Sequence, residues 1–129
     1  MRKKLYSAVL AVTLIASATI ALAQDPNQQV TGNGLYDGYK AWKKITDRAA
    51  MPRDALDGGF YAGYVSGVID AEAARKNAGV NPLWCAPSGW IYGQTFDIVG
   101  RYLESHPERR QLHRSILVYE ALAQAWPCQ

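Results

Sequence analysis

The side chains that could attack a substrate in this sequence are one cysteine and one serine, with two histidines as possible bases. Cys85 lies in the stretch WCAPSGW, and His106 and His113 follow it along the chain. A thiol attacks as the thiolate, so such a site requires a free Cys85 beside an imidazole. Ser88 is a weak substitute, because APSGW lacks the first glycine of the Gly-x-Ser-x-Gly elbow.

The two histidines are also the candidate metal ligands, with Glu104 and Glu108 nearby. A zinc site usually has three or four ligands at closer spacing, and Pro107 disfavours a helix that continues through His106. We interpret ESHPE as a helix end followed by a turn, with His106 close to the negative end of the helix dipole. The sequence therefore predicts no metal site and no other cofactor.

Paired carboxylates do not supply an alternative chemistry. Asp70 and Glu72 stand two positions apart on a predicted helix, where they point to different faces. Asp70 is instead expected to be a partly buried hydrogen-bonding residue. The sequence also lacks a phosphate-binding loop and a dinucleotide fingerprint. We expect a binding protein and not an enzyme.

The first 23 residues resemble a secretory signal peptide. Arg2, Lys3 and Lys4 precede an apolar run over 8–22, and ALA at 21–23 is a small-x-small cleavage site. An uncleaved anchor is the alternative, but the run is short for a span of about 20 residues. We expect a cleaved leader (1–23), a flexible lead-in (24–33) and a secreted domain (34–129), with no membrane contact after cleavage.

The charge of the mature chain excludes one class of partner. The full chain has 14 basic and 11 acidic side chains. Three of the basic ones lie in the leader, so 11 of each sign remain after cleavage. A nucleic-acid-binding surface requires clustered basic residues, and the sequence shows no such cluster. We therefore expect no nucleic-acid partner.

The two cysteines of the mature chain are expected to form a disulfide. Cys85 and Cys128 are the only cysteines, and the predicted compartment is oxidising. A bridge over this separation stabilises by about 4 kcal/mol on the chain-entropy estimate. A free thiol at Cys85, or two metal ligands, remain as alternatives.

Apolar residues recur at helical spacing in four segments, which predicts a four-helix, all-α domain. The expected helices cover 34–49, ended by Pro52; 54–76, with Asp54 as N-cap and Asn77 and Gly79 as the stop; 93–105; and a last helix from 108 or 114 to 126. A connector rich in proline and glycine at 82–89 joins the second and third helices. The many aromatic residues can fill the core, and a surplus would suit protein recognition.

The second predicted helix contains a row of glycines at every fourth position. Gly59, Gly63 and Gly67 form this row, and Ala71 extends it. A glycine in a helix interior costs up to about 1 kcal/mol relative to alanine, so we expect a close neighbour along the row. A packed helix or an aromatic ring is one candidate, and the seam of a homodimer is the other.

Three segments together resemble a known family. They are GYVSGVIDA (63–71), WCAPSGWIYGQTFDIVGRYLESHPE (84–108) and LVYEALAQAWPC (117–128). In this order they are similar to the Rap/Tai family of immunity proteins against type VI secretion amidase effectors. Where the family commonly has a threonine cap before the third helix, this chain has Ile91, and we expect a cap weaker by about 1 kcal/mol.

The resemblance implies a helical domain with a Cys85–Cys128 disulfide, frequent homodimerisation and inhibition of a peptidoglycan amidase in the periplasm. The motif residues are expected to be scaffold: Gly59, Gly63, Gly67, Asp70, Pro87, Gly89, Gly93, Gln94, His106 and Pro107. Partner contacts are expected on 75–84 and 108–114, from Arg75, Lys76, Asn81, Trp84, Arg109, Arg110 and His113. A housekeeping periplasmic binding or chaperone-like protein of the same fold, without an effector, is the alternative function.

Overall fold

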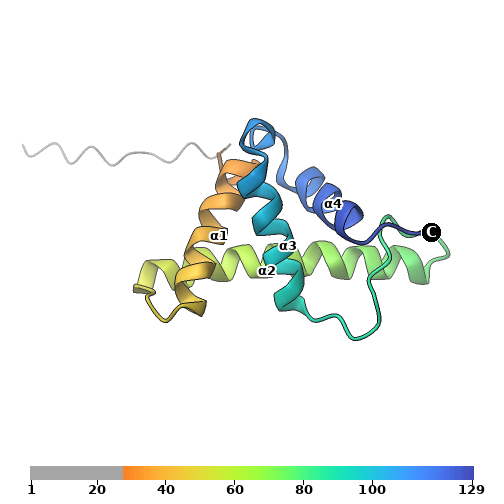
Figure 1. Ribbon diagram of the computed structural model, residues 1–129, viewed down its shortest axis with the longest axis horizontal. Helices are drawn as coiled ribbons and strands as arrows, with labels where there is room; N and C mark the ends of the chain where they lie inside the picture. The colour runs from red at the N-terminus through yellow and green to blue at the C-terminus, as the bar shows by residue number, and fades with distance from the viewer. Residues whose placement is uncertain (1–27) are drawn as a thin grey trace, which may run out of the picture.

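The computed structural model describes residues 28–129, and four α-helices account for most of them (Figure 1). The expected leader and the first four residues of the expected lead-in, 24–27, lie outside these residues. The helices confirm the predicted all-α class, and their order with two short 3-10 turns is η1 (Gln28–Val30), α1 (Gly32–Thr46), α2 (Pro52–Asn77), α3 (Tyr92–Ser105), η2 (Pro107–Arg109) and α4 (Arg114–Ala125).

The start of α2 corrects one sequence prediction. Pro52 does not terminate α1, which ends at Thr46, but occupies the first turn of α2. Proline is tolerated there because the first N–H groups of a helix have no partner within the helix. Asp54 is not the N-cap; it lies one turn further in and accepts a hydrogen bond from the Met51 N–H at 2.9 Å. At the other end Gly79 adopts φ +80°, which ends α2 as predicted.

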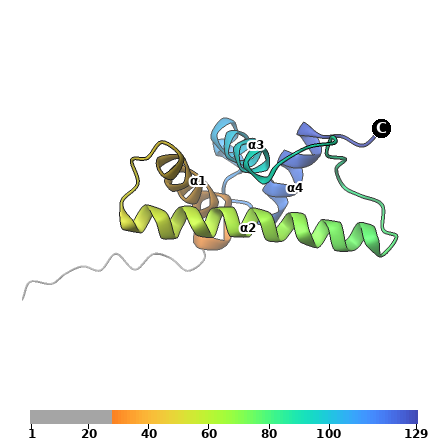
Figure 2. The same cartoon turned by 90° about the horizontal axis from the view of Figure 1, so that it is seen from below.

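Helix α2 extends across the whole molecule, and the other three helices lie on one side of it (Figures 1 and 2). Its inner face carries Tyr61, Val65 and Ile69, which are at most 6% exposed. These side chains meet apolar residues of the other helices in one core, completed by Leu35, Tyr39, Trp84, Phe96, Val99, Leu103, Leu117, Val118, Ala121 and Leu122. The opposite face of α2 is left uncovered by α1, α3 and α4.

The close helix contacts occur at glycines outside the predicted row. A Cβ atom at Gly58 would lie 2.9 Å from the Trp42 nitrogen, and one at Gly100 would overlap the Tyr39 ring. By contrast, nothing lies within 4 Å of a Cβ built at Gly59, Gly63 or Gly67. The expectation that another part of this chain packs against that row is therefore wrong, because the row lies on the uncovered face of α2.

The α3–α4 hairpin is tied to the rest of the fold at both ends. At one end, the Gly32 and Asn33 N–H groups at the start of α1 donate to the carbonyls of Leu112 and Arg110, each at 2.9 Å. At the other end, the predicted disulfide is confirmed between Cys85 and Cys128. Among the described residues, no helix is long and apolar enough to span a membrane.

Candidate partner-binding surface

The two segments predicted to contact a partner lie at opposite ends of the α3–α4 hairpin (Figure 1). One is 75–84, which comprises the last turn of α2 and the first half of the connector 78–91 between α2 and α3. The other is 108–114, which comprises most of the turn 106–113 between α3 and α4 and the first residue of α4. Helix α3 has 14 residues, which corresponds to about 21 Å at 1.5 Å per residue. The structure therefore separates the predicted residues into two surfaces.

A buried carboxylate holds the connector 78–91 against α2. Glu72 is 4% exposed and accepts the Leu83 N–H at 2.6 Å. Its other oxygen forms an ion pair with Arg75, one turn further along α2. Burying a carboxylate without partners costs free energy. The contacts with Leu83 and Arg75 offset that cost, and they hold the connector at Leu83 against α2. The Arg75 guanidinium, predicted to contact a partner, is thus partly committed to Glu72.

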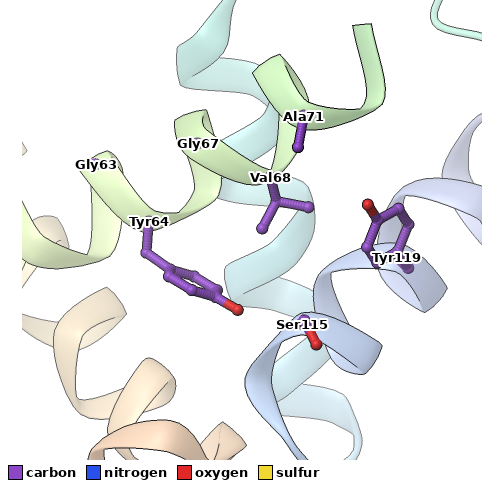
Figure 3. A pocket seen from close by; sticks show the side chains of 7 residues that line it. All are labelled: Gly63, Tyr64, Gly67, Val68, Ala71, Ser115 and Tyr119. Carbon is purple, nitrogen blue, oxygen red and sulfur yellow. The ribbon is translucent and has the colours of Figure 1, made fainter. Parts of the chain in front are cut away.

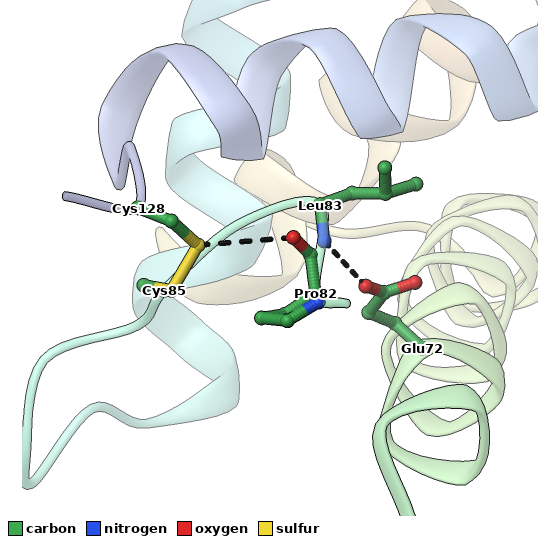
Figure 4. The surroundings of a disulfide bond; sticks show 5 residues. All are labelled: Glu72, Pro82, Leu83, Cys85 and Cys128. Carbon is green, nitrogen blue, oxygen red and sulfur yellow. Dashed lines mark hydrogen bonds between the residues drawn. A yellow bond between two sulfur atoms is a disulfide. The ribbon is translucent and has the colours of Figure 1, made fainter. Parts of the chain in front are cut away.

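The second half of the connector is fastened to the end of α4 (Figure 4). The Cys85 N–H donates to the Trp126 carbonyl at 2.8 Å beside the disulfide with Cys128. Trp84 is 7% exposed, and its ring lies 5.2 Å from that of Tyr119. The indole therefore supports the connector from below. The sequence analysis had placed Trp84 on the contact surface, and its burial contradicts that expectation.

The exposed part of the connector has a mixed apolar and polar surface. Lys76 and Asn81 are exposed as predicted. Val80 and Leu83 are 44% and 49% exposed, and the sequence analysis did not include them. Apolar side chains in a loop between two helices were the signal that could have identified them. A rigid backbone with exposed apolar side chains is a common form of protein-binding surface, because little ordering entropy is lost on binding.

At the other end of the hairpin, Arg109 is held by an ion pair. Its guanidinium donates to both carboxylate oxygens of Glu120, with a distance of 3.1 Å from Nε to Oε2. The Tyr102 hydroxyl donates to the same carboxylate at 2.8 Å. Partial burial acts to raise the pKa of Glu120, but the bonds from Arg109 and Tyr102 outweigh it and lower that pKa below its ordinary value. The bond to Glu120 raises the pKa of Arg109 in turn.

The other predicted contacts of this turn also have internal roles. Arg110 donates through Nε to the Leu103 carbonyl at 2.6 Å, and its guanidinium lies 3.7 Å from the centre of the Tyr36 ring. His113 is the N-cap of α4 and accepts the Ser115 N–H at 3.3 Å. Arg109, Arg110 and His113 are thus all engaged within the chain. The connector 78–91 therefore has more exposed side chains that are free to contact a partner than the turn 106–113 has.

The motif residues take structural positions. His106 ends α3, where its Nδ1 lies 2.9 Å from the Tyr102 carbonyl oxygen, and Pro107 begins η2. Gln94 accepts the Ile91 N–H at 3.2 Å and so supports the start of α3, where isoleucine offers no side-chain cap. Gly89 has φ +79°, which favours glycine. Asp70 accepts a hydrogen bond as expected, from the Tyr92 hydroxyl at 2.9 Å, but the expectation that it is partly buried is wrong, because it lies on an exposed part of α2. Gly93 is half-buried and Pro87 exposed.

A shallow groove lies along the edge of the uncovered face of α2, where α2 meets α4 (Figure 3). It has a volume of about 390 Å³ and lies between α2 and α4, lined by Gly63, Tyr64, Gly67, Val68, Ala71, Ser115 and Tyr119. The lining is almost entirely apolar. In residues 28–129 no three His, Cys, Asp or Glu side chains lie together in a way that could hold a metal ion. The connector and the groove can therefore contact a partner through shape complementarity and apolar side chains.

Comparison with protein families identifies the chain. The family model described as Rap1a immunity proteins matches residues 31–128. The chain belongs to the Rap1a immunity protein family. The match runs from Thr31, which pairs with His113 across a β-bridge, to Cys128 of the disulfide, so it covers the folded unit. Searches among curated proteins and among solved structures found no significant match.

Membership in the Rap1a family confirms the relationship indicated by the sequence motifs. An immunity protein acts on a protein effector, so the relevant chemistry of this Rap1a protein is recognition of another protein. The family match covers α1 to α4 as a whole and does not select one surface. Which surface meets the effector must therefore be inferred from exposure and geometry.

Proposed function

We propose that this Rap1a-family protein is a periplasmic immunity protein that binds and inhibits a type VI secretion peptidoglycan amidase. The family match over residues 31–128 is the observation that carries the proposal. The disulfide between Cys85 and Cys128 supports an oxidising compartment, and the leader expected at 1–23 would deliver the chain there. The protein would inhibit by covering the cleft of the amidase, without catalytic residues of its own.

The connector 78–91, with Lys76, is the proposed contact surface. It is held at Leu83 by Glu72 and at Cys85 by the disulfide, and it exposes the side chains of Val80 and Leu83. A preformed loop of this kind enters a cleft without a large loss of conformational entropy. The turn 106–113 is the less favoured surface, because Arg109 and Arg110 bond within the chain.

Capture of the partner tests the function. The oxidised mature chain, residues 24–129, is immobilised and exposed to extracts of cells with active type VI secretion, and bound proteins are identified by mass spectrometry. We expect stoichiometric recovery of an amidase whose release of peptidoglycan fragments is blocked by the added protein. Recovery of only general periplasmic proteins would contradict immunity and favour the housekeeping function.

Variants of the connector test the surface. Leu83→Asp and Lys76→Glu are expected to weaken binding of the captured amidase by at least about tenfold, because contacts at the centre of an interface dominate its affinity. Lys40→Glu is the matched control, since Lys40 is an exposed lysine on α1, away from the connector. Equal affinity of all three variants would remove the connector from the contact surface and leave the turn 106–113 as the next candidate.

We also propose that the protein acts as a homodimer. The uncovered face of α2 supports this part of the proposal, since within the described chain no other helix packs on it. Dimerisation and inhibition are separate statements. A monomeric inhibitor would contradict the first and leave the second unchanged.

A further inference from the structure

The uncovered face of α2 combines bulky and open positions in a fixed order. In its first half, Leu56 and Phe60 are 60% and 70% exposed, four residues apart. In its second half, Gly63 and Gly67 are also four residues apart, and nothing lies within 4 Å of a Cβ built on either. We call these four residues the α2 outer face. Along one helix, two projecting side chains are therefore followed by two positions without a side chain, and both pairs have a four-residue spacing.

This order makes the α2 outer face complementary to itself in the antiparallel direction. When a second α2 helix runs in the opposite direction, Phe60 can lie opposite Gly63 of the second copy. The same register then brings Leu56 opposite Gly67, because both pairs have the four-residue spacing that places side chains on one face of a helix. A two-fold axis repeats both contacts. A parallel copy would instead place the bulky residues against each other.

The charges at the ends of the face agree with this register. Arg53 lies one turn before Leu56; its side chain is 74% exposed, and its Nε lies 3.5 Å from a carboxylate oxygen of Asp57 in an exposed pair on the same helix. Asp70 lies one turn after Gly67 and is exposed, with the Tyr92 hydroxyl on one oxygen. The antiparallel register therefore brings Arg53 to the same level as Asp70 of the second copy, twice in the pair. Opposite charges at matching positions favour this partner over an unrelated helix.

The groove beside the glycines has room for the exposed ring. It is apolar, has a volume of about 390 Å³, and is bordered by Tyr64 and Tyr119 (Figure 3). In the antiparallel register, Phe60 of the second copy enters the molecule at Gly63, on the edge of this groove. Aromatic rings pack well against other rings at offset or edge-on angles. The groove thereby widens the contact beyond one helix.

We infer that two copies of this chain associate through the α2 outer face, with the α2 helices antiparallel and Phe60 of each seated at Gly63 of the other. The inference rests on the homodimer proposed above and assigns its surface. Contact of small residues also explains why three glycines persist in a helix interior without a close neighbour in their own chain.

Molecular mass in solution tests the inference. The oxidised mature chain is measured by size-exclusion chromatography with light scattering over a range of concentrations, and we expect twice the mass of one chain. Phe60→Glu and Gly67→Leu are expected to raise the dissociation constant of the dimer at least about tenfold. A Cβ atom at Gly67 meets nothing within 4 Å in the single chain, and an unchanged circular dichroism spectrum and melting curve of Gly67→Leu will separate loss of the dimer from misfolding. Val80→Glu is the control and should remain dimeric.

Crosslinking tests the register. In the Leu56→Cys, Gly67→Cys variant the two new thiols are about 16 Å apart along one helix, so they cannot form a bridge within a chain. We expect oxidation to produce a covalent dimer, and Leu56→Cys alone to produce much less. A wild-type chain that is monomeric at all concentrations would refute the homodimer itself. A wild-type dimer whose mass is unchanged by Phe60→Glu and Gly67→Leu would refute this surface alone. If these variants stay dimeric and lose binding to the amidase, the α2 outer face contacts the effector and not a second copy.

Discussion

Two glycines on opposite sides of α2 are expected to respond to the same substitution with opposite signs. At Gly63 an added methyl group meets nothing within 4 Å, whereas at Gly58 it lies 2.6 Å from the Ile45 Cδ1 and 2.9 Å from the Trp42 nitrogen. Both positions lie inside the same helix, so the intrinsic gain of helix propensity is equal. The difference between the two variants therefore measures packing alone.

The magnitudes follow from that geometry. Gly63→Ala should raise the free energy of unfolding by about 1 kcal/mol, the propensity difference between glycine and alanine. In a domain of this size the melting temperature should rise by about 4–8 °C. At Gly58 the same gain is outweighed by overpacking, which costs about 1–3 kcal/mol and here acts against backbone atoms of Trp42. We expect Gly58→Ala to lose about 1 kcal/mol net.

Urea unfolding followed by circular dichroism measures both effects. The protein is kept at submicromolar concentration, so that dimer dissociation does not contribute to the transition. Destabilisation by Gly63→Ala at this concentration would show that another part of the chain covers the α2 outer face. A neutral Gly58→Ala would show that α1 and α2 are further apart than the structure places them. Either result would refute the assignment of an inner and an outer face.

Two further predictions concern the connections at the two ends of the α3–α4 hairpin. Replacing Cys85 and Cys128 by serine should lower the free energy of unfolding by about 4 kcal/mol on the chain-entropy estimate, and an unchanged urea midpoint under the same conditions would contradict this. Because the folded pKa of Glu120 lies below its ordinary value of 4.5, its bonds with Arg109 and Tyr102 stabilise the protein above that pH, and the contribution is lost as the pH falls through the folded pKa. The stability difference between wild type and Glu120→Gln should therefore shrink in acid, and a difference constant from pH 7 to pH 3 would exclude this ion pair as its cause.

The sequence was informative where the cause is local. Apolar residues at spacings of three and four predicted the four helices, and Gly79 correctly marked the end of α2. Two cysteines in a predicted oxidising compartment sufficed for the disulfide. The least accurate local prediction was at Pro52, because proline ends one helix and begins another at similar positions, and only the backbone hydrogen bonds separate the two cases.

The exposure of individual side chains depended on contacts between distant segments. Trp84 was expected on a surface, but the disulfide and Tyr119 draw it into the core. Arg109 looked available in a polar turn, yet Glu120 on α4 binds it. In both cases the partner lies on another element, so no local pattern could have revealed it.

The sequence by itself determined the helices, the cross-link and the family of this protein, because these depend on residue types at short spacing or on motifs in order. Only the tertiary structure decided which face of α2 is inside. Both faces offer apolar or small residues, Tyr61, Val65 and Ile69 on one and the glycine row on the other. The helical period cannot choose between them. The packing of α1, α3 and α4 makes that choice, and it leaves the glycines open to a second molecule.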